Sequence, residues 1–162
     1  SETPANNTTS ALVARAEELQ ASTVAVMEVP ESEISKYGVA QIEKEMGGEP
    51  PLFKVSGFVE KPRADRAPSS WALPGRYVFY PEIFSFLQGA KPGILGEIQL
   101  TDSMNQMAQN GAFYASGFMA QRFDAGDKLG YLQANIELAL TNPDLKTSLS
   151  LYLKDLVMKG RV

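Results

Sequence analysis

The sequence predicts an α/β fold with a mixed, mostly parallel β-sheet between helices. Residues 11–20 place apolar side chains at helical spacing, and residues 23–29 (TVAVMEV) follow as a near-continuous apolar run. Such a run is typical of a strand that is covered on both faces in a parallel sheet. A helical pattern that leads into a buried strand favours helices layered on a sheet.

The other elements are predicted from local patterns. Strands are expected at 38–46, 52–60, 75–80 and 112–123, and helices at 82–88, 97–109 and 128–140. A last amphipathic helix is expected after a break at residues 142–144 and extends to about residue 158. Asp127 is predicted to cap the helix at 128–140, because a carboxylate at that position accepts a free helix N–H. Residues 1–9 are expected to form a polar tail. Residues 10–162 are expected to form one domain, since no linker, repeat or low-complexity tract divides them.

Composition excludes several classes of function. The chain has 162 residues, 44% of them hydrophobic, which is enough for one globular domain with a core. The net charge is −4 and the 15 basic residues are scattered, so a nucleic-acid-binding surface is not expected. No apolar run reaches membrane-spanning length, and the start lacks the pattern of a secretory signal. We therefore expect no membrane association and a cytoplasmic location.

The chain contains neither cysteine nor histidine. Their absence excludes thiolate nucleophiles, disulfides, Ser-His triads and histidine-ligated metals. Catalysis would therefore depend on carboxylates, lysine, arginine, tyrosine, hydroxyls, backbone amides or an oxygen-bound cation.

Glu60 and Lys61 follow a predicted strand, which Pro62 ends because proline lacks a backbone donor. On spacing alone, a surface charge pair is the commoner explanation. The alternative is a ligand site in which the ammonium binds a phosphate and the carboxylate accepts sugar hydroxyls. Gly75 could simply begin a strand, or it could let a ligand approach the backbone.

Two later motifs carry acidic residues at the ends of elements. Glu97 precedes a predicted helix, where it could favour the helix dipole or face a polyol. Asp124 follows the predicted strand at 112–123, and open α/β sheets bind ligands at the carboxyl ends of their strands. An aspartate there could hold Mg²⁺.

The order of these motifs is more specific than any one of them. VEKP (59–62), GRY (75–77), GEIQLTD (96–102) and FDAGDKLGYL (123–132) occur in sequence. This order resembles the bacterial UTP–glucose-1-phosphate uridylyltransferases, within the wider sugar-phosphate nucleotidyltransferase family. The resemblance extends from about residue 11 to about residue 155.

The resemblance implies a Rossmann-like, three-layer α/β/α nucleotidyltransferase fold and assigns roles to individual residues. Lys61 would bind the phosphate of glucose 1-phosphate, and Glu60 would accept hydroxyls of the glucose. Gly75 and Glu97 would border the sugar. Asp124 would bind Mg²⁺, and Lys128 would be a further phosphate contact.

By the same resemblance, the partners are UTP and glucose 1-phosphate, and the products are UDP-glucose and pyrophosphate. The family's glycine-rich loop, which holds the nucleotide phosphates, has no counterpart here. We therefore expect the chain to be the C-terminal, sugar-binding half of such an enzyme and to be inactive alone. An apolar sheet edge left uncovered would favour a homo-oligomer. Two alternatives remain: transfer of another nucleotide, or a non-catalytic module that binds sugar phosphates or oligomerises.

Overall fold

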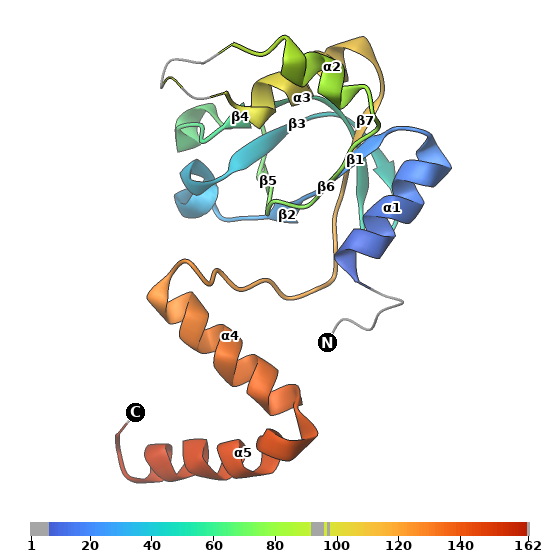
Figure 1. Ribbon diagram of the computed structural model, residues 1–162. Helices are drawn as coiled ribbons and strands as arrows, with labels where there is room; N and C mark the ends of the chain where they lie inside the picture. The colour runs from blue at the N-terminus through green and yellow to red at the C-terminus, as the bar shows by residue number, and fades with distance from the viewer. Residues whose placement is uncertain (1–6, 92–95, 97, 162) are drawn as a thin grey trace. The chain divides into compact units, whose positions relative to one another are not determined.

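The computed structural model describes residues 7–91, 96 and 98–161 (Figure 1). The chain forms two compact units, one that ends at Met119 and one that runs from Ala120. The single domain expected for residues 10–162 stays a prediction.

The first unit contains most of the elements. They are α1 (Thr8–Leu19), β1 (Ser22–Ala25), β2 (Met27–Glu28), the 3-10 helix η1 (Glu31–Lys36), β3 (Gly38–Gly47), β4 (Leu52–Glu60), the 3-10 helix η2 (Ala64–Arg66), β5 (Trp71–Ala72), β6 (Tyr77–Val78), α2 (Ile83–Gln88), α3 (Leu100–Asn110) and β7 (Phe113–Ser116). The second unit contains α4 (Lys128–Thr141) and α5 (Pro143–Met158).

The seven strands of the described residues form one mixed sheet in the order β2-β5-β3-β4-β7-β1-β6. Among the strand pairs of the described residues, β1–β7 alone is parallel, so the expectation of a mostly parallel sheet was wrong. The buried pattern of β1 was interpreted correctly, because all four of its residues are buried and it forms the parallel pair. Strands β3 and β4 are joined by a short turn, which only antiparallel neighbours allow. Strands β1 and β6, and β4 and β7, also pair antiparallel although they lie far apart in the chain.

The predicted strand at 23–29 is divided into β1 and β2, with Val26 between them. These two strands lie at distant positions in the sheet order although one residue separates them in the chain. The sheet therefore curves back on itself, as the ribbon shows (Figure 1).

Helices cover both faces of the sheet at β1. The hydroxyl of Thr23 donates to the backbone oxygen of Leu12 in α1, and that of Ser22 donates to the sulfur of Met107 in α3. Because neighbouring strand residues point to opposite faces, α1 and α3 cover opposite faces of β1. This arrangement confirms the α/β layering that the sequence predicts.

The core of the first unit lies between α3 and the sheet. Its central residues are Val24, Val55, Phe58, Met104 and Phe113, all buried. The rings of Phe58 and Phe113 meet edge to face with centroids 5.0 Å apart, a favourable geometry for aromatic pairs. This packing fixes α3 against β4, the strand that carries Glu60.

The second unit consists of α4 packed against α5. Asp127 caps α4, since its side chain accepts a hydrogen bond from the backbone N–H of Gly130 at 2.9 Å, as the sequence predicts. Asn142 caps α5 in the same way, with Pro143 in the first turn. None of the described helices combines the length and the apolar character needed to cross a bilayer.

Candidate functional site

Glu60 and Lys61 lie where β4 ends. Glu60 is the last residue of β4 and pairs with Gly38, the first residue of β3. Lys61 has a φ of 44°, a left-handed conformation that is uncommon outside glycine, and its N–H donates to Tyr37 O at 3.1 Å. The strand therefore ends at Glu60, two residues before Pro62, and the turn leaves Lys61 exposed.

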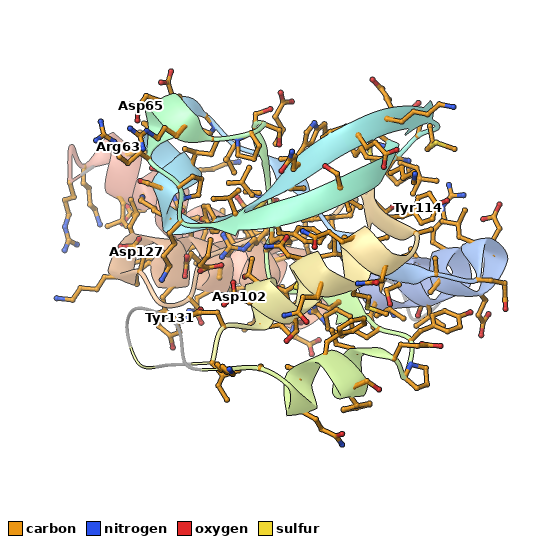
Figure 2. All side chains as sticks on the ribbon, turned by 90° about the horizontal axis from the view of Figure 1, so that it is seen from above. Arg63, Asp65, Asp102, Tyr114, Asp127 and Tyr131 are labelled. Carbon is orange, nitrogen blue, oxygen red and sulfur yellow. The ribbon has the colours of Figure 1, made fainter. Side chains whose placement is uncertain are left out.

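The Glu60 carboxylate is held from α3. The hydroxyl of Thr101, in the first turn of that helix, donates to Glu60 Oε2 at 3.0 Å. Thr101 is 9% exposed, whereas Glu60 is exposed. A charged strand-end side chain is thus anchored to a buried hydroxyl. Figure 2 shows this first turn at Asp102, the exposed residue that follows Thr101.

The segment around Gly75 connects to the same strand end. Leu73, two residues earlier, donates its N–H to Gly38 O at 2.8 Å, and Gly38 is the strand partner of Glu60. Burial raises the pKa of Tyr77, two residues after Gly75, and the nearby Glu60 carboxylate raises it further. Gly75 itself has a φ of +97°, and a Cβ there would meet no atom within 4 Å. Glycine is therefore required for its backbone conformation, not for packing.

The loop after β4 carries a second charged pair. Arg63 and Asp65 form an ion pair of 3.1 Å between Nε and Oδ1 (Figure 2). Both side chains are exposed, so this pair contributes little to stability.

Asp124 and Lys128 belong to the second unit. Both carboxylate oxygens of Asp124 are engaged within its own turn: Oδ1 accepts from Gly126 N at 3.0 Å, and Oδ2 lies 3.3 Å from an Arg122 nitrogen. Lys128 is the exposed first residue of α4. Their placement in one site with Glu60 and Lys61 stays a prediction, and Glu97 lies outside the described residues.

The acidic residues give limited support for a metal site. Within the part of the chain that the structure describes, no three Asp or Glu side chains gather where a metal ion could bind. Asp124 could supply one carboxylate ligand to a hard cation. Mg²⁺ commonly uses one or two carboxylates and completes its shell with water and substrate phosphates, so this single donor is compatible with such a site.

The glycine pair at Gly47-Gly48 does not form a phosphate-binding loop. Both residues have positive φ, 79° and 96°; Gly47 is the last residue of β3, and Gly48 begins the turn that leads to β4. A phosphate cradle requires a glycine-rich turn that leads into a helix N-terminus. This turn leads into a strand instead.

Three residues near Glu60 were missed by the sequence interpretation: Thr101, Gly38 and Tyr77. Thr101 lies in the GEIQLTD motif, in which the sequence pattern pointed to Glu97. Its place in a helix first turn could be predicted, but its contact with a residue 41 positions earlier could not.

Comparison with known proteins identifies the wider group. Residues 4–140 match the protein family described as nucleotidyl transferase. The chain is 43% identical over 137 residues to the UTP–glucose-1-phosphate uridylyltransferase of Streptococcus pneumoniae, covering 85% of this chain and 45% of that protein. Against the enzyme of the same name from Staphylococcus epidermidis, it is 41% identical over 140 residues, covering 86% and 48%.

Two solved structures have the same fold. One is a UDP-glucose pyrophosphorylase complexed with UDP-glucose, with a TM-score of 0.74 and 35% identity, covering 82% of this chain and 49% of that one. The other is a UTP-bound UGPase from Acinetobacter baumannii, with a TM-score of 0.83 and 29% identity, covering 96% and 53%. The chain spans about half the length of the curated relatives it matches, 45% of the first.

Proposed function

This chain belongs to the nucleotidyl transferase family, and we propose that it is the glucose-1-phosphate-binding half of a UTP–glucose-1-phosphate uridylyltransferase. The observation that carries the proposal is its 43% identity, over 85% of its length, to the Streptococcus pneumoniae enzyme of that name. The similarity to a pyrophosphorylase complexed with UDP-glucose supports the same substrate class.

The proposed reaction is attack by the phosphate oxygen of glucose 1-phosphate on the α-phosphorus of UTP. A new oxygen–phosphorus bond forms, the bond from the α-phosphorus to the bridging oxygen breaks, and pyrophosphate leaves. Positioning and charge neutralisation supply the rate enhancement, so neither histidine nor a covalent protein intermediate is needed.

The proposed residue roles centre on the end of β4. Lys61 is exposed next to Glu60, where its ammonium can neutralise a sugar phosphate as a point charge. Glu60 accepts sugar hydroxyls, and the Gly75 segment borders the sugar. Glu97 and Lys128 are proposed as further sugar and phosphate contacts.

Enzymes of this type generally use a divalent metal ion, and we assign Mg²⁺ to Asp124 within the same proposal. When bound, the metal would neutralise phosphate charge. A cytoplasmic location and a homo-oligomeric state belong to the proposal as well. Large apolar side chains of the helical unit, such as Leu132 and Leu151, are exposed and support association. Light scattering on the purified chain tests the homo-oligomeric state, and a monomer at every concentration would contradict that state.

The binding experiment is titration calorimetry of the 162-residue chain with glucose 1-phosphate. Lys61→Ala should weaken affinity roughly tenfold to a hundredfold, since charge-assisted hydrogen bonds contribute about 1.5–3 kcal/mol. Lys44→Ala, which removes an exposed lysine from β3, is the matched control and should leave affinity unchanged. Equal affinities of Lys61→Ala and Lys44→Ala would contradict the phosphate role.

The catalytic experiment is pyrophosphate release from UTP and glucose 1-phosphate in the presence of Mg²⁺. We expect no turnover by the chain alone, because the described residues offer candidate groups for one of the two substrates. Turnover comparable to that of a full-length relative would overturn the assignment to one half. A non-catalytic module that binds sugar phosphates is the second candidate function. It is favoured because Gly47-Gly48 lie where β3 turns back into β4, and so do not form a loop that could hold nucleotide phosphates. Activity after addition of a separate nucleotide-binding half would exclude it.

A further inference from the structure

The contact between Thr101 and Glu60 joins a buried hydroxyl to an exposed carboxylate. Thr101 Oγ1 donates to Glu60 Oε2 at 3.0 Å across 41 residues of sequence. The residue at the cap of α3, Gln99, makes no side-chain capping bond. The first turn of α3 therefore directs its hydroxyl to the neighbouring strand end.

Gly38 provides the space for this arrangement. It is the strand partner of Glu60, and a Cβ built on it would lie 3.0 Å from Glu60 Oε2. That separation is shorter than ordinary carbon–oxygen contact, so a Cβ at this position would shift the carboxylate by a few tenths of an ångström. Oε2 thus lies close to both the Thr101 hydroxyl and the Gly38 backbone.

A second contact makes the position of Thr101 independent of Glu60. Asn105, one helical turn further along α3, donates to Phe58 O at 2.9 Å and accepts from Phe58 N at 2.6 Å. Residues four apart on a helix lie on one face, so Thr101 and Asn105 both face β4. Asn105 anchors α3 to the backbone of β4. The position of the Thr101 hydroxyl therefore does not depend on its hydrogen bond to Glu60.

We propose that Thr101 is a positioning residue that holds one oxygen of Glu60 and leaves the other to receive a sugar hydroxyl. This inference rests on the proposed function, in which Glu60 binds the sugar of glucose 1-phosphate. Within the described ranges, no protein group donates a hydrogen bond to Oε1 of Glu60. Oε1 is therefore the oxygen available to the ligand.

The expected benefit is pre-organisation. A glutamate side chain at the surface has many rotamers, and a ligand that binds it must restrict them. The Thr101 hydroxyl restricts them before the ligand arrives. Its loss should therefore weaken binding of a ligand that uses Glu60, and should not affect a ligand that uses only Lys61.

The test compares glucose 1-phosphate with inorganic phosphate by titration of the 162-residue chain. Thr101→Val keeps the shape of the side chain without the hydroxyl, and should weaken glucose 1-phosphate binding about fivefold to tenfold. Inorganic phosphate binding should stay within twofold. Thr101→Ser retains the hydroxyl and should restore sugar phosphate affinity. Gly38→Ala, whose Cβ would crowd Glu60 Oε2, should weaken glucose 1-phosphate binding as Thr101→Val does.

Several results would overturn the positioning role of Thr101. If Thr101→Val weakens both ligands equally, or Thr101→Ser fails to restore affinity, the hydroxyl has a structural role and the inference is overturned. It is also overturned if Thr101→Val binds glucose 1-phosphate like the unaltered chain. A failure of the unaltered chain to bind glucose 1-phosphate would overturn the proposed function, and this inference with it. Fluorescence of Trp71, the single tryptophan, reports whether each variant keeps the folded sheet.

Discussion

The side chain of Asn105 binds both backbone polar groups of Phe58, with its amide donating to the oxygen at 2.9 Å and its carbonyl accepting from the nitrogen at 2.6 Å. Strand β7 pairs with β4 only from Leu52 to Lys54, so it does not reach Phe58. Strand β3 pairs with Phe58 on one edge of β4, and Asn105 takes the place of a strand on the other edge. Asn105 connects α3 to the segment of β4 that leads to Glu60.

Asn105→Ala is expected to lower the free energy of unfolding by about 2 kcal/mol, since it leaves two partly buried backbone groups without partners. Urea denaturation followed by Trp71 fluorescence measures this, because the Trp71 ring lies 4.7 Å from that of Phe53 in the sheet. Gln106→Ala, at an exposed position of the same helix, is the control and should change stability by less than about 0.5 kcal/mol. Equal unfolding midpoints for the two variants would contradict the role of Asn105.

Lys61→Gly should separate stability from ligand binding. The φ of 44° at Lys61 is unfavourable for a residue with a Cβ and costs glycine little. We expect Lys61→Gly to be about 1 kcal/mol more stable than Lys61→Ala, which keeps the strain but also lacks the ammonium. Both variants should bind phosphate weakly. A glycine variant less stable than the alanine variant would show that the backbone is not strained at this position.

Gly130→Ala should disrupt the turn that carries Asp124. A Cβ at residue 130 would collide with the backbone oxygen of Asp124. Helix propensity alone predicts that alanine stabilises α4 by about 1 kcal/mol, so propensity and collision predict opposite results. We expect the collision to dominate, and hydrogen exchange at the Gly126 amide, which is bonded to Asp124, should become faster.

Gly111→Ala is the matched control for Gly130→Ala. A Cβ at residue 111 would lie 3.9 Å from Met107 O, an ordinary contact. This variant should leave the exchange rate at Gly126 unchanged. Unchanged exchange at Gly126 in the Gly130→Ala variant would contradict the predicted displacement.

Tyr77 should make stability depend on pH under alkaline conditions. Its pKa in the folded chain is raised above 10.0 by burial and by the Glu60 carboxylate. As the pH rises through 10.0 toward the raised pKa, the unfolded chain loses the Tyr77 proton before the folded chain does. The folded state then binds more protons than the unfolded state, so the free energy of unfolding falls as the pH rises. Urea midpoints measured across this range should fall less steeply for Tyr77→Phe.

Glu60→Gln should lower the pKa of Tyr77 but leave it above 10.0, because burial is the larger cause and remains. Absorbance of the phenolate, with Tyr77→Phe subtracted, measures this value. An identical Tyr77 titration in Glu60→Gln and the unaltered chain would show that the carboxylate does not lie near the phenol.

Sequence patterns predicted most elements, but several strand lengths were wrong. The strands expected at 75–80 and 112–123 extend only over Tyr77–Val78 and Phe113–Ser116. Each of these strands extends only as far as a neighbouring strand pairs with it. Strand β6 pairs with two residues of β1, and β7 pairs with four residues of β1. A strand ends where its partner ends, and that partner cannot be identified from the residues of the strand itself.

The features that the sequence determined by itself depend on residues close together in the chain. The cap of α4 needs only Asp127 and the amide three residues later, so local propensity sufficed to predict it. The motif order from Glu60 to Asp124 likewise identified the family. The tertiary structure alone decided the antiparallel pairing and the contact of Thr101 with Glu60 across 41 residues. Such contacts form only when packing of the whole core offsets the entropy of closing the long intervening segment, and no local pattern encodes that balance.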